Sequence, residues 1–264
     1  MNSLGFNKKE NDTKVIVAMS GGVDSSVAAV KLKMEGYDVT GVTLRLYNQP
    51  NSSKSKSCCA GIDIDDAKKV AEQYDFPHKI FDYQDKFFNG VISNFVDSYA
   101  NGETPVPCIQ CNQTVKFSDL LEESKNLNAD ALVTGHYAIR KGGLKESKLF
   151  KAKDKTKDQS YFLFATLQDQ LDYVRFPLGN YLKSEIRQMA NQYQLVVSDK
   201  PDSQDICFVT SDSYRDLINK IQPDINKEGN IFDLNGNKIG LHKGIANYTV
   251  GQRKRVGVGG QDQP

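Results

Sequence analysis

Short apolar runs alternate with amphipathic segments along the first half of the chain. A run rich in β-branched residues at 15–19 is followed by a glycine turn, a helical pattern at 26–35 and a second apolar run at 39–46. Strand, helix and strand in this order form a parallel βαβ unit. The alternation continues, and it predicts helices at 64–74, 85–100 and 115–126 and strands at 78–81 and 131–135. We therefore expect a doubly wound parallel α/β sheet.

The pattern changes after residue 140. A charged segment at 140–150 contains two glycines and predicts a loop or a hairpin, and helical patterns follow at 159–167 and 183–194. From residue 229 onward, short strand patterns flank Asn235-Gly236, a dipeptide that strongly favours a hairpin turn.

These patterns predict three parts. A sheet domain is expected at 1–139, a helical segment that completes it at 140–222, and the start of a central β domain, the beginning of a barrel, at 223–264. The third part is undersized for a domain of its own, so we expect the sequence to be truncated within it.

Composition sets limits on location and partners. The chain has 264 residues, with 34 Lys and Arg against 33 Asp and Glu, so a net charge of +1 gives no reason to expect a nucleic acid. The first fourteen residues lack the apolar stretch of a secretory signal, and no run of about 18 apolar residues occurs. We expect a cytoplasmic protein that does not span a membrane.

Five cysteines are too few for a disulfide scaffold in a chain of this size. They form a vicinal pair at Cys58 and Cys59, a C-x-x-C motif at Cys108 and Cys111, and a single residue at Cys207. This grouping indicates redox, metal or nucleophile chemistry, although the vicinal pair favours an incidental or structural interpretation.

The sequence SGGVDSS at 20–26 lies between a predicted buried strand and a predicted helix. Glycines allow backbone amides to approach an oxyanion, and hydroxyl groups and the helix N-terminus add favourable interactions. The segment therefore predicts a phosphate cradle, with a plain glycine turn as the alternative. It is neither a Walker A loop nor a G-x-G-x-x-G motif. Asp24 is expected to hold Mg²⁺ or the loop itself.

SGGVDSS resembles the signature of N-type ATP pyrophosphatases, the PP-loop enzymes that cleave ATP between its α and β phosphates. Six further blocks occur in the order found in tRNA-specific 2-thiouridylases. They are TPVPCIQCNQTVKF at 104–117, TGHYA at 134–138, KDQSYFLF at 157–164, FPLGNYLKSEIR at 176–187, KPDSQDICFV at 200–209 and YTVGQRK at 248–254. On these blocks, the chain resembles that family from residue 14 to residue 260.

The resemblance implies an adenine nucleotide alpha hydrolase-like sheet and ATP-dependent 2-thiolation of a tRNA wobble uridine. ATP would adenylate the C2 oxygen of uracil, sulfur would attack C2, and AMP would leave. The implied cofactors are ATP and Mg²⁺. The implied partners are a tRNA with a wobble uridine and a sulfur-donor protein, either a persulfide relay or a cysteine desulfurase.

Site residues follow from the same resemblance. ATP is expected to contact Ala18, Met19, Ser20, Gly21, Gly22, Val23, Asp24, Ser25, Leu44 and Gly135. The tRNA or its target base is expected to contact Val106, Pro107, Cys108, His136, Lys157, Asp158 and Gln159. Cys207 corresponds to the persulfide carrier and Cys111 to its partner, which resolves the persulfide by disulfide formation. An acid–base role for His136, which would need a pKa near neutrality, stays open.

Cys108 departs from the family pattern, in which an aspartate stands three residues before the catalytic cysteine. One interpretation is harmless replacement, and the other is a three-thiolate set of Cys108, Cys111 and Cys207. Three thiolates can hold a [4Fe–4S] cluster or form part of a zinc site. The sequence leaves both open.

The basic segment at 140–157 contains eight basic and two acidic residues, a local excess of +6. Such a run is often a solvated face, but it leads directly into the expected tRNA contact at 157–159. Asp63, Asp65 and Asp66 either bind a cation or interact with a helix dipole. Two other functions stay open: another adenylating PP-loop ligase, or a tRNA-binding fragment without turnover.

Overall fold

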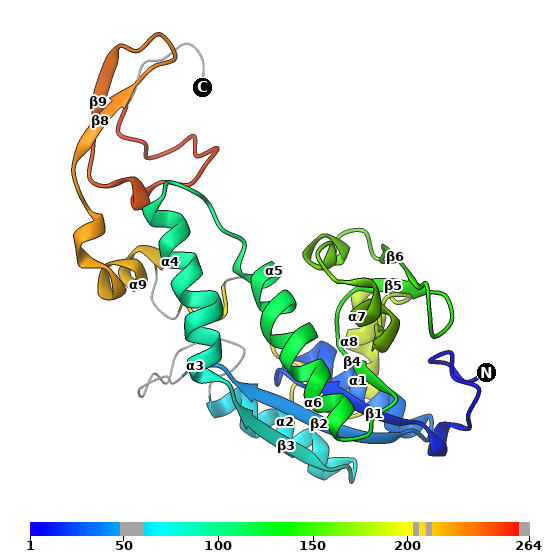
Figure 1. The fold of residues 1–264 in the computed structure, drawn as a ribbon. Helices are drawn as coiled ribbons and strands as arrows, with labels where there is room; N and C mark the ends of the chain where they lie inside the picture. Colours follow the sequence, from blue (N-terminus) through cyan, green and yellow to red (C-terminus); the bar gives the residue numbers. More distant parts are fainter. Residues whose placement is uncertain (48–60, 203–205, 210–212, 259–264) are drawn as a thin grey trace.

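A five-stranded parallel sheet forms the centre of the structure (Figure 1). This computed structural model describes residues 1–47, 61–202, 206–209 and 213–258. The strand order is β3-β2-β1-β4-β7, and every neighbouring pair is parallel. The strands are β1 (Lys14–Ala18), β2 (Asp38–Arg45), β3 (His78–Asp82), β4 (Ala131–Val133) and β7 (Val174–Arg175). The predicted doubly wound parallel sheet is confirmed.

Helices cover both faces of the sheet. One layer contains α1 (Val23–Met34), α2 (Gly61–Gln73) and α8 (Lys183–Gln192). The other contains α3 (Gln84–Phe87), α4 (Ser93–Ala100), α5 (Pro107–Cys111) and α6 (Leu120–Asn126). Successive residues of β1 enter opposite layers, because Val15 and Val17 pack with the first and Ile16 with the second.

Two helical stretches differ in detail from the prediction. A π-helical turn at Phe88–Ile92 joins α3 to α4, and another at Asn112–Asp119 joins α5 to α6. The second stretch therefore begins at Pro107, not near residue 115. Proline is favourable in the first helical turn because its missing N–H would have no intrahelical partner there.

The prediction of a helix at 159–167 is wrong. Instead, a 3₁₀ turn occupies Ser160–Leu163 and α7 occupies Gln168–Tyr173. Gln159 exchanges two hydrogen bonds with Tyr137, since its backbone N–H donates to the Tyr137 carbonyl and its Oε1 accepts from the Tyr137 N–H. These bonds hold the start of the segment against another loop, and the helix begins later, where Oε1 of Gln170 accepts from the Leu167 N–H.

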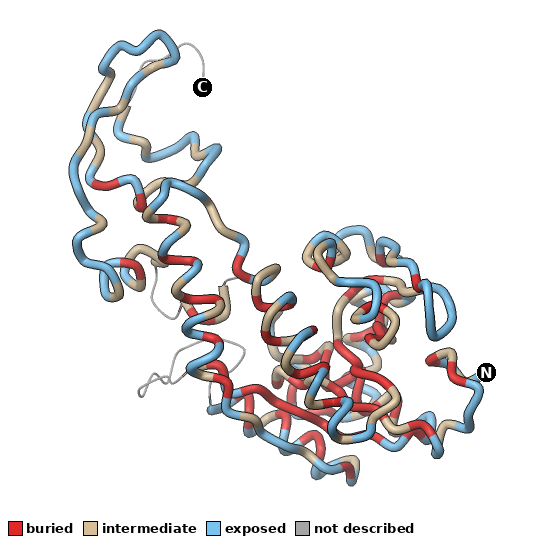
Figure 2. The backbone as a smooth tube through the Cα atoms, in the orientation of Figure 1, coloured by how far each residue is buried: buried red, intermediate tan, exposed pale blue. Residues whose placement is uncertain are grey.

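Two antiparallel hairpins lie outside the sheet. The first pairs β5 (Ala138–Lys141) with β6 (Lys148–Lys151), which confirms the hairpin alternative for residues 140–150. The second pairs β8 (Gly229–Phe232) with β9 (Lys238–His242), and its turn contains the predicted Asn235-Gly236. Figure 2 shows that the second hairpin is largely exposed, in contrast to the largely buried strands β1, β2, β4 and β7 of the sheet.

The remaining elements are short. Helix α9 occupies Tyr214–Ile221, and 3₁₀ turns lie at Glu10–Asp12, Pro223–Ile225 and Ile245–Asn247. Within the described part of the chain, no helix has the length and apolar character needed to cross a membrane. The loop expected at 48–57 and the vicinal pair Cys58 and Cys59 lie outside the described residues.

Phe95 connects α4 to two later segments. It is 1% exposed, and its ring centroid lies 5.3 Å from that of Phe208 and 6.4 Å from that of Tyr214. We predict that Phe95→Ala lowers the free energy of unfolding by about 3–5 kcal/mol, because it leaves a cavity in this aromatic cluster. Urea unfolding measures the change. Phe88→Ala is the matched control, since Phe88 is 44% exposed, and equal losses in the two variants would contradict the assignment.

Candidate functional site

A cavity of about 200 Å³ opens at the carboxyl ends of β1, β2 and β4. The chain order of the sheet reverses between β1 and β4, and open α/β sheets bind ligands at such a switch point. Nine residues predicted for nucleotide or tRNA contact line the cavity: Ala18, Met19, Ser20, Asp24, Ser25, Leu44, Gly135, His136 and Gln159. Gly21, Gly22 and Val23 belong to the same loop and helix start but are not among its lining residues.

Sequence reasoning missed five of the lining residues: Val42, Leu46, Lys116, Leu120 and Thr134. Val42 and Leu46 stand two positions on either side of Leu44, so strand alternation was a usable signal for both. Lys116 and Leu120 are four residues apart in the helical stretch that begins at Pro107. No local signal marks these two, because their position depends on how that stretch packs against the sheet.

The loop at 20–25 is shaped by two very close backbone approaches. Gly21 has φ +72°, and a Cβ there would lie 2.0 Å from the carbonyl oxygen of Asp63. A Cβ at Gly135 would lie 2.9 Å from the backbone nitrogen of Ser25, at the start of α1. Only glycine fits either position without movement. The N–H of Ser20 donates to Oγ of Ser25 at 3.1 Å, which holds the loop against the helix start.

Two lysines from distant segments meet this loop. Nζ of Lys183 donates to both carboxylate oxygens of Asp24, at 2.6 and 2.8 Å, and the hydroxyl of Tyr137 donates to the same carboxylate at 2.7 Å. Nζ of Lys200 donates to the Gly21 carbonyl at 2.9 Å. Lys200 also forms ion pairs with Asp63 and Asp66, so a lysine side chain is the cation that these carboxylates bind.

The described residues do not form a Mg²⁺ site by themselves. Asp24 is the expected ligand, but its carboxylate is paired with Lys183. Among the residues that the structure describes, no group of three or more His, Cys, Asp or Glu side chains is arranged to hold a metal ion. Proteins commonly bind Mg²⁺ through one or two carboxylates together with substrate phosphates, and only such a shared site fits Asp24.

The same finding bears on the cysteines. Cys108 is exposed, Cys111 is buried on α5, and Cys207 is half-buried. Cys111 and Cys207 belong to one apolar cluster and therefore lie on the same side of the sheet. In the described geometry, these three cysteines do not form a metal-binding group, so the structure gives the three-thiolate alternative no support.

Aromatic contacts dock the segment that carries Cys207. The hydroxyl of Tyr47, just after β2, donates to the Cys207 carbonyl at 2.6 Å. The ring of Phe208 packs edge-on against Phe87 and Phe95, with centroid distances of 5.6 and 5.3 Å. Cys207 is therefore attached to the helical layer that also contains Cys111.

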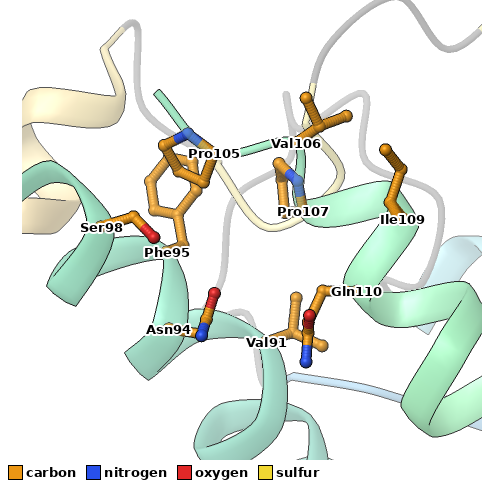
Figure 3. A pocket seen from close by; sticks show the side chains of 9 residues that line it. All are labelled: Val91, Asn94, Phe95, Ser98, Pro105, Val106, Pro107, Ile109 and Gln110. Atoms are coloured by element: carbon orange, nitrogen blue, oxygen red, sulfur yellow. The ribbon is translucent and has the colours of Figure 1, made fainter. Parts of the chain in front are cut away.

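A second cavity, of about 260 Å³, lies beside the segment predicted to meet the target base (Figure 3). Asn94 of α4 and Gln110 of α5 contribute amide groups from its two flanking helices. Val106 is exposed at this cavity and Pro107 is buried. The cavity therefore combines an apolar lining with two amide groups that can form hydrogen bonds.

The stretch at 157–159 divides between structural and exposed roles. Oδ1 of Asp158 accepts from the Ala152 N–H and Oδ2 from the Ser160 hydroxyl, both at 2.8 Å, while Gln159 lines the cavity at the switch point. Lys157 is 41% exposed at its side chain and pairs with Asp202 at 2.8 Å. Lys157 is therefore the member of this stretch whose charge is accessible to an external ligand.

Some of the basic side chains at 140–157 make contacts within the fold. Arg140 donates to the carbonyls of Leu171 and Asp172, and Lys153 pairs with Glu185. Five other lysines of the segment are exposed: Lys141, Lys145, Lys148, Lys151 and Lys155. The local positive charge is thus presented mainly by the β5–β6 hairpin and the turn after it.

His136 is neutral across the physiological pH range. Burial, followed by the positive charge of Lys116, lowers its pKa to about 3. Its Nδ1 lies 2.8 Å from Oγ1 of Thr134, within hydrogen-bond distance. An acid–base role that depends on titration near neutrality does not fit this environment.

Family models and relatives of known name match this chain over most of its length. The family model described as the tRNA methyl transferase HUP domain matches residues 13–211, and the tRNA methyl transferase PRC-barrel domain matches residues 215–264. The tRNA-specific 2-thiouridylase MnmA of Dinoroseobacter shibae is 53% identical over 266 residues, covering 100% of this chain and 69% of that protein. The corresponding protein of Jannaschia sp. is also 53% identical, with 100% and 70% covered.

A solved structure with the same fold is a 4-thiouridine synthetase in complex with RNA and bound ATP. The TM-score is 0.51 at 16% sequence identity, and the match covers 81% of this chain and 51% of that chain. At this identity the likeness concerns the fold alone.

Gly21 provides a direct test of the loop geometry. We predict that Gly21→Ala destabilises the protein by at least about 2 kcal/mol and abolishes ATP binding, because the new Cβ collides with the Asp63 carbonyl at an unfavourable φ. Gly22→Ala is the control, since a Cβ there meets only Oγ of Ser20 at 3.6 Å. Thermal unfolding and calorimetric ATP titration measure both effects. Equal stability of the two variants would contradict the prediction.

The lowered pKa of His136 predicts a pH-dependent stability term. Between pH 6.5 and about 3, an unfolded histidine binds a proton that folded His136 does not, so acidification favours unfolding over this window. We expect His136→Gln to lose stability less steeply than the wild type between pH 6.5 and 4. Urea unfolding at several pH values measures this slope, and parallel curves would show that the prediction is wrong.

Proposed function

The chain belongs to the tRNA-specific 2-thiouridylase family, and from this membership we propose that it catalyses ATP-dependent 2-thiolation of the wobble uridine of tRNA. The family models carry a methyl transferase description, whereas the relatives are named for thiolation. The residues favour thiolation, because a loop that binds ATP phosphates and a pair of cysteines serve sulfur transfer and have no evident use in methyl transfer.

One observation supports the proposal most directly. The helical stretch that begins with Pro107–Cys111 continues to Lys116 and Leu120, which line the cavity at the switch point of the sheet. Lys116 stands five positions after Cys111, so the two residues are at most about 7.5 Å apart along the helix axis at the α-helical rise per residue, and the intervening stretch is π-helical. One continuous helical stretch therefore carries the Cys111 thiol and two residues that line the cavity at the switch point.

We assign nucleotide binding to the residues of the loop and the cavity. The loop at 20–25 would receive the ATP phosphates at the N-terminus of α1, and Leu44 and Gly135 would lie against the nucleoside. Mg²⁺, when bound with ATP, would neutralise phosphate charge beside Asp24. Lys183 and Lys200 supply positive charge on the protein side of the same loop.

The proposed chemistry has two stages. Attack of the uracil C2 oxygen on the α-phosphate releases pyrophosphate and makes AMP a good leaving group at C2. The terminal sulfur of a persulfide on Cys207 then attacks C2 and AMP departs, which leaves the base joined to Cys207 through a disulfide bond. The Cys111 thiolate attacks Sγ of Cys207, which forms a Cys111–Cys207 disulfide and releases 2-thiouridine.

External thiol chemistry completes the cycle. A thiol reductant must reduce the Cys111–Cys207 disulfide, and a persulfide-bearing protein, either a relay protein or a desulfurase, must reload Cys207. The target base would enter beside Val106, Pro107 and Cys108, and Lys157 would contact tRNA phosphate.

The cysteines provide the test of this function. We predict that Cys111→Ser and Cys207→Ser each lower 2-thiouridine formation at least a hundredfold while ATP binding is retained, because each removes one sulfur of the proposed exchange. Mass spectrometry of tRNA nucleosides, after incubation with ATP, Mg²⁺, a persulfide source and a thiol reductant, measures the product.

Cys108→Ser is the matched control. The two-cysteine route predicts near wild-type product from this variant, whereas a three-thiolate cluster predicts loss of product together with loss of iron. Absence of 2-thiouridine from the wild-type chain, with or without oxygen, would contradict the proposed thiolation. Conversion of ATP to AMP that continues without tRNA and without either cysteine would favour another adenylating ligase.

A further inference from the structure

Asp202 lies at the centre of an ion-pair network to which the proposed chemistry gives no role. Its Oδ1 accepts from Arg187 at 2.7 Å and lies 3.0 Å from Nζ of Lys183, and its Oδ2 accepts from Lys157 at 2.8 Å. The three cations come from α8 and from the loop before the 3₁₀ turn at Ser160–Leu163. The carboxylate of Asp202 thus joins its own segment to helix α8 and to the loop that contains Lys157.

Lys183 and Lys157 connect Asp202 to two different parts of the proposed site. Lys183 contacts Asp202 and, through the same Nζ, both oxygens of Asp24 in the nucleotide loop. Lys157 is the accessible lysine of the proposed tRNA contact. A path of three direct polar contacts therefore runs from Lys157 through Asp202 and Lys183 to Asp24.

Arg187 fixes the chain on which Asp202 stands. Its NH1 group donates to the carbonyls of Ser198 and Lys200, at 2.8 and 2.5 Å, while NH2 binds Asp202. Lys200 in turn donates to the Gly21 carbonyl. The segment that ends five residues before Cys207 is thus held to α8 and to the nucleotide loop together.

The network carries a net positive charge beside the nucleotide loop. Lys157, Lys183 and Arg187 contribute three positive charges, and Asp24 and Asp202 contribute two negative charges. Burial raises the pKa of Asp202, but the hydrogen bonds from its cations outweigh burial and hold this pKa well below its usual range. Asp202 therefore stays ionised at any pH at which the protein functions.

We propose that Asp202 is a positioning residue that couples tRNA binding to ATP binding. A tRNA phosphate that binds Lys157 competes with Asp202 for the same ammonium group. Asp202 then interacts more strongly with Lys183, which weakens the hold of Lys183 on Asp24 and opens the loop carboxylate to the ATP-bound cation. Because coupling is reciprocal, ATP binding changes tRNA affinity by the same factor. This inference rests on the proposed function, since it takes tRNA and ATP as the two ligands.

The experiment measures the coupling factor, which is the ratio of the dissociation constants of an ATP analogue without and with tRNA. The dissociation constant of a non-hydrolysable ATP analogue, with Mg²⁺, is determined by calorimetry with and without saturating unmodified tRNA. We expect tRNA to tighten analogue binding at least fivefold in the wild type and less than twofold in Asp202→Asn. A merely structural role would shift both dissociation constants by the same factor and leave their ratio unchanged.

Two variants keep the test decisive. Lys157→Gln changes the partly exposed end of the network, so it tests the same link even if Asp202→Asn folds poorly, and it should also lose the coupling. In the double variant Lys157→Gln with Asp202→Asn, the coupling factor should fall no further than in either single variant. Circular dichroism and thermal unfolding establish that each variant is folded.

Asp130→Asn is the matched control. Asp130 pairs with Lys8 and accepts from the Lys14 N–H at 3.0 Å. It lies at the amino ends of β1 and β4, whereas the nucleotide loop follows the carboxyl end of β1. The Asp130→Asn variant should therefore keep the wild-type coupling factor between tRNA binding and ATP-analogue binding. Wild-type coupling in Asp202→Asn, or no coupling in a wild-type protein that still forms 2-thiouridine, would overturn the inference without affecting the proposed function.

Discussion

The structure depends on the burial of β1 between two parallel neighbours and two helical layers. Val15, Ile16 and Val17 are fully buried, and their alternation anchors one layer on each side. Because β2 and β4 pair with opposite sides of β1, the chain order of the strands reverses between β1 and β4, and the switch point lies at the carboxyl ends of these strands. The loop at 20–25 has to emerge at this point, so the position of the proposed nucleotide site follows from the packing of one five-residue strand.

Two lysine side chains place positive charge beside the loop at 20–25, where a polyanion such as ATP would bind. In the described part of the chain, Lys183 and Lys200 reach the loop from segments more than 150 residues further along the sequence, and each is held by carboxylates. Such pairs hold an ammonium group in place but leave it available to a stronger anion, since the triphosphate of ATP as a whole carries more negative charge than one carboxylate. The ion pairs therefore organise the loop before any nucleotide binds.

Much of the fold could be predicted from local pattern, and the exceptions have physical causes. The parallel strands and the Asn235-Gly236 hairpin carry their own sequence signals. Strand β7 has only two residues, Val174 and Arg175, and is defined by pairing with β4, so no periodicity reveals it and the sheet extends beyond residue 139. Nine residues that the family resemblance assigned to ATP or tRNA line one cavity, whereas the positions of Lys116 and of the contact between Lys183 and Asp24 depend on tertiary packing.

The exposure of the three described cysteines fits a division of labour between them. A sulfur that receives a persulfide from another protein must be accessible at some stage, and half-buried Cys207 meets that requirement better than Cys111. Cys111 is buried in the apolar cluster and is therefore shielded from outside oxidants, which suits the proposed resolving role. Cys108 is exposed one helical turn away, where it is accessible to solvent without occupying the apolar cluster. The two members of the C-x-x-C motif therefore lie in different environments, Cys111 in the apolar cluster and Cys108 at the solvent.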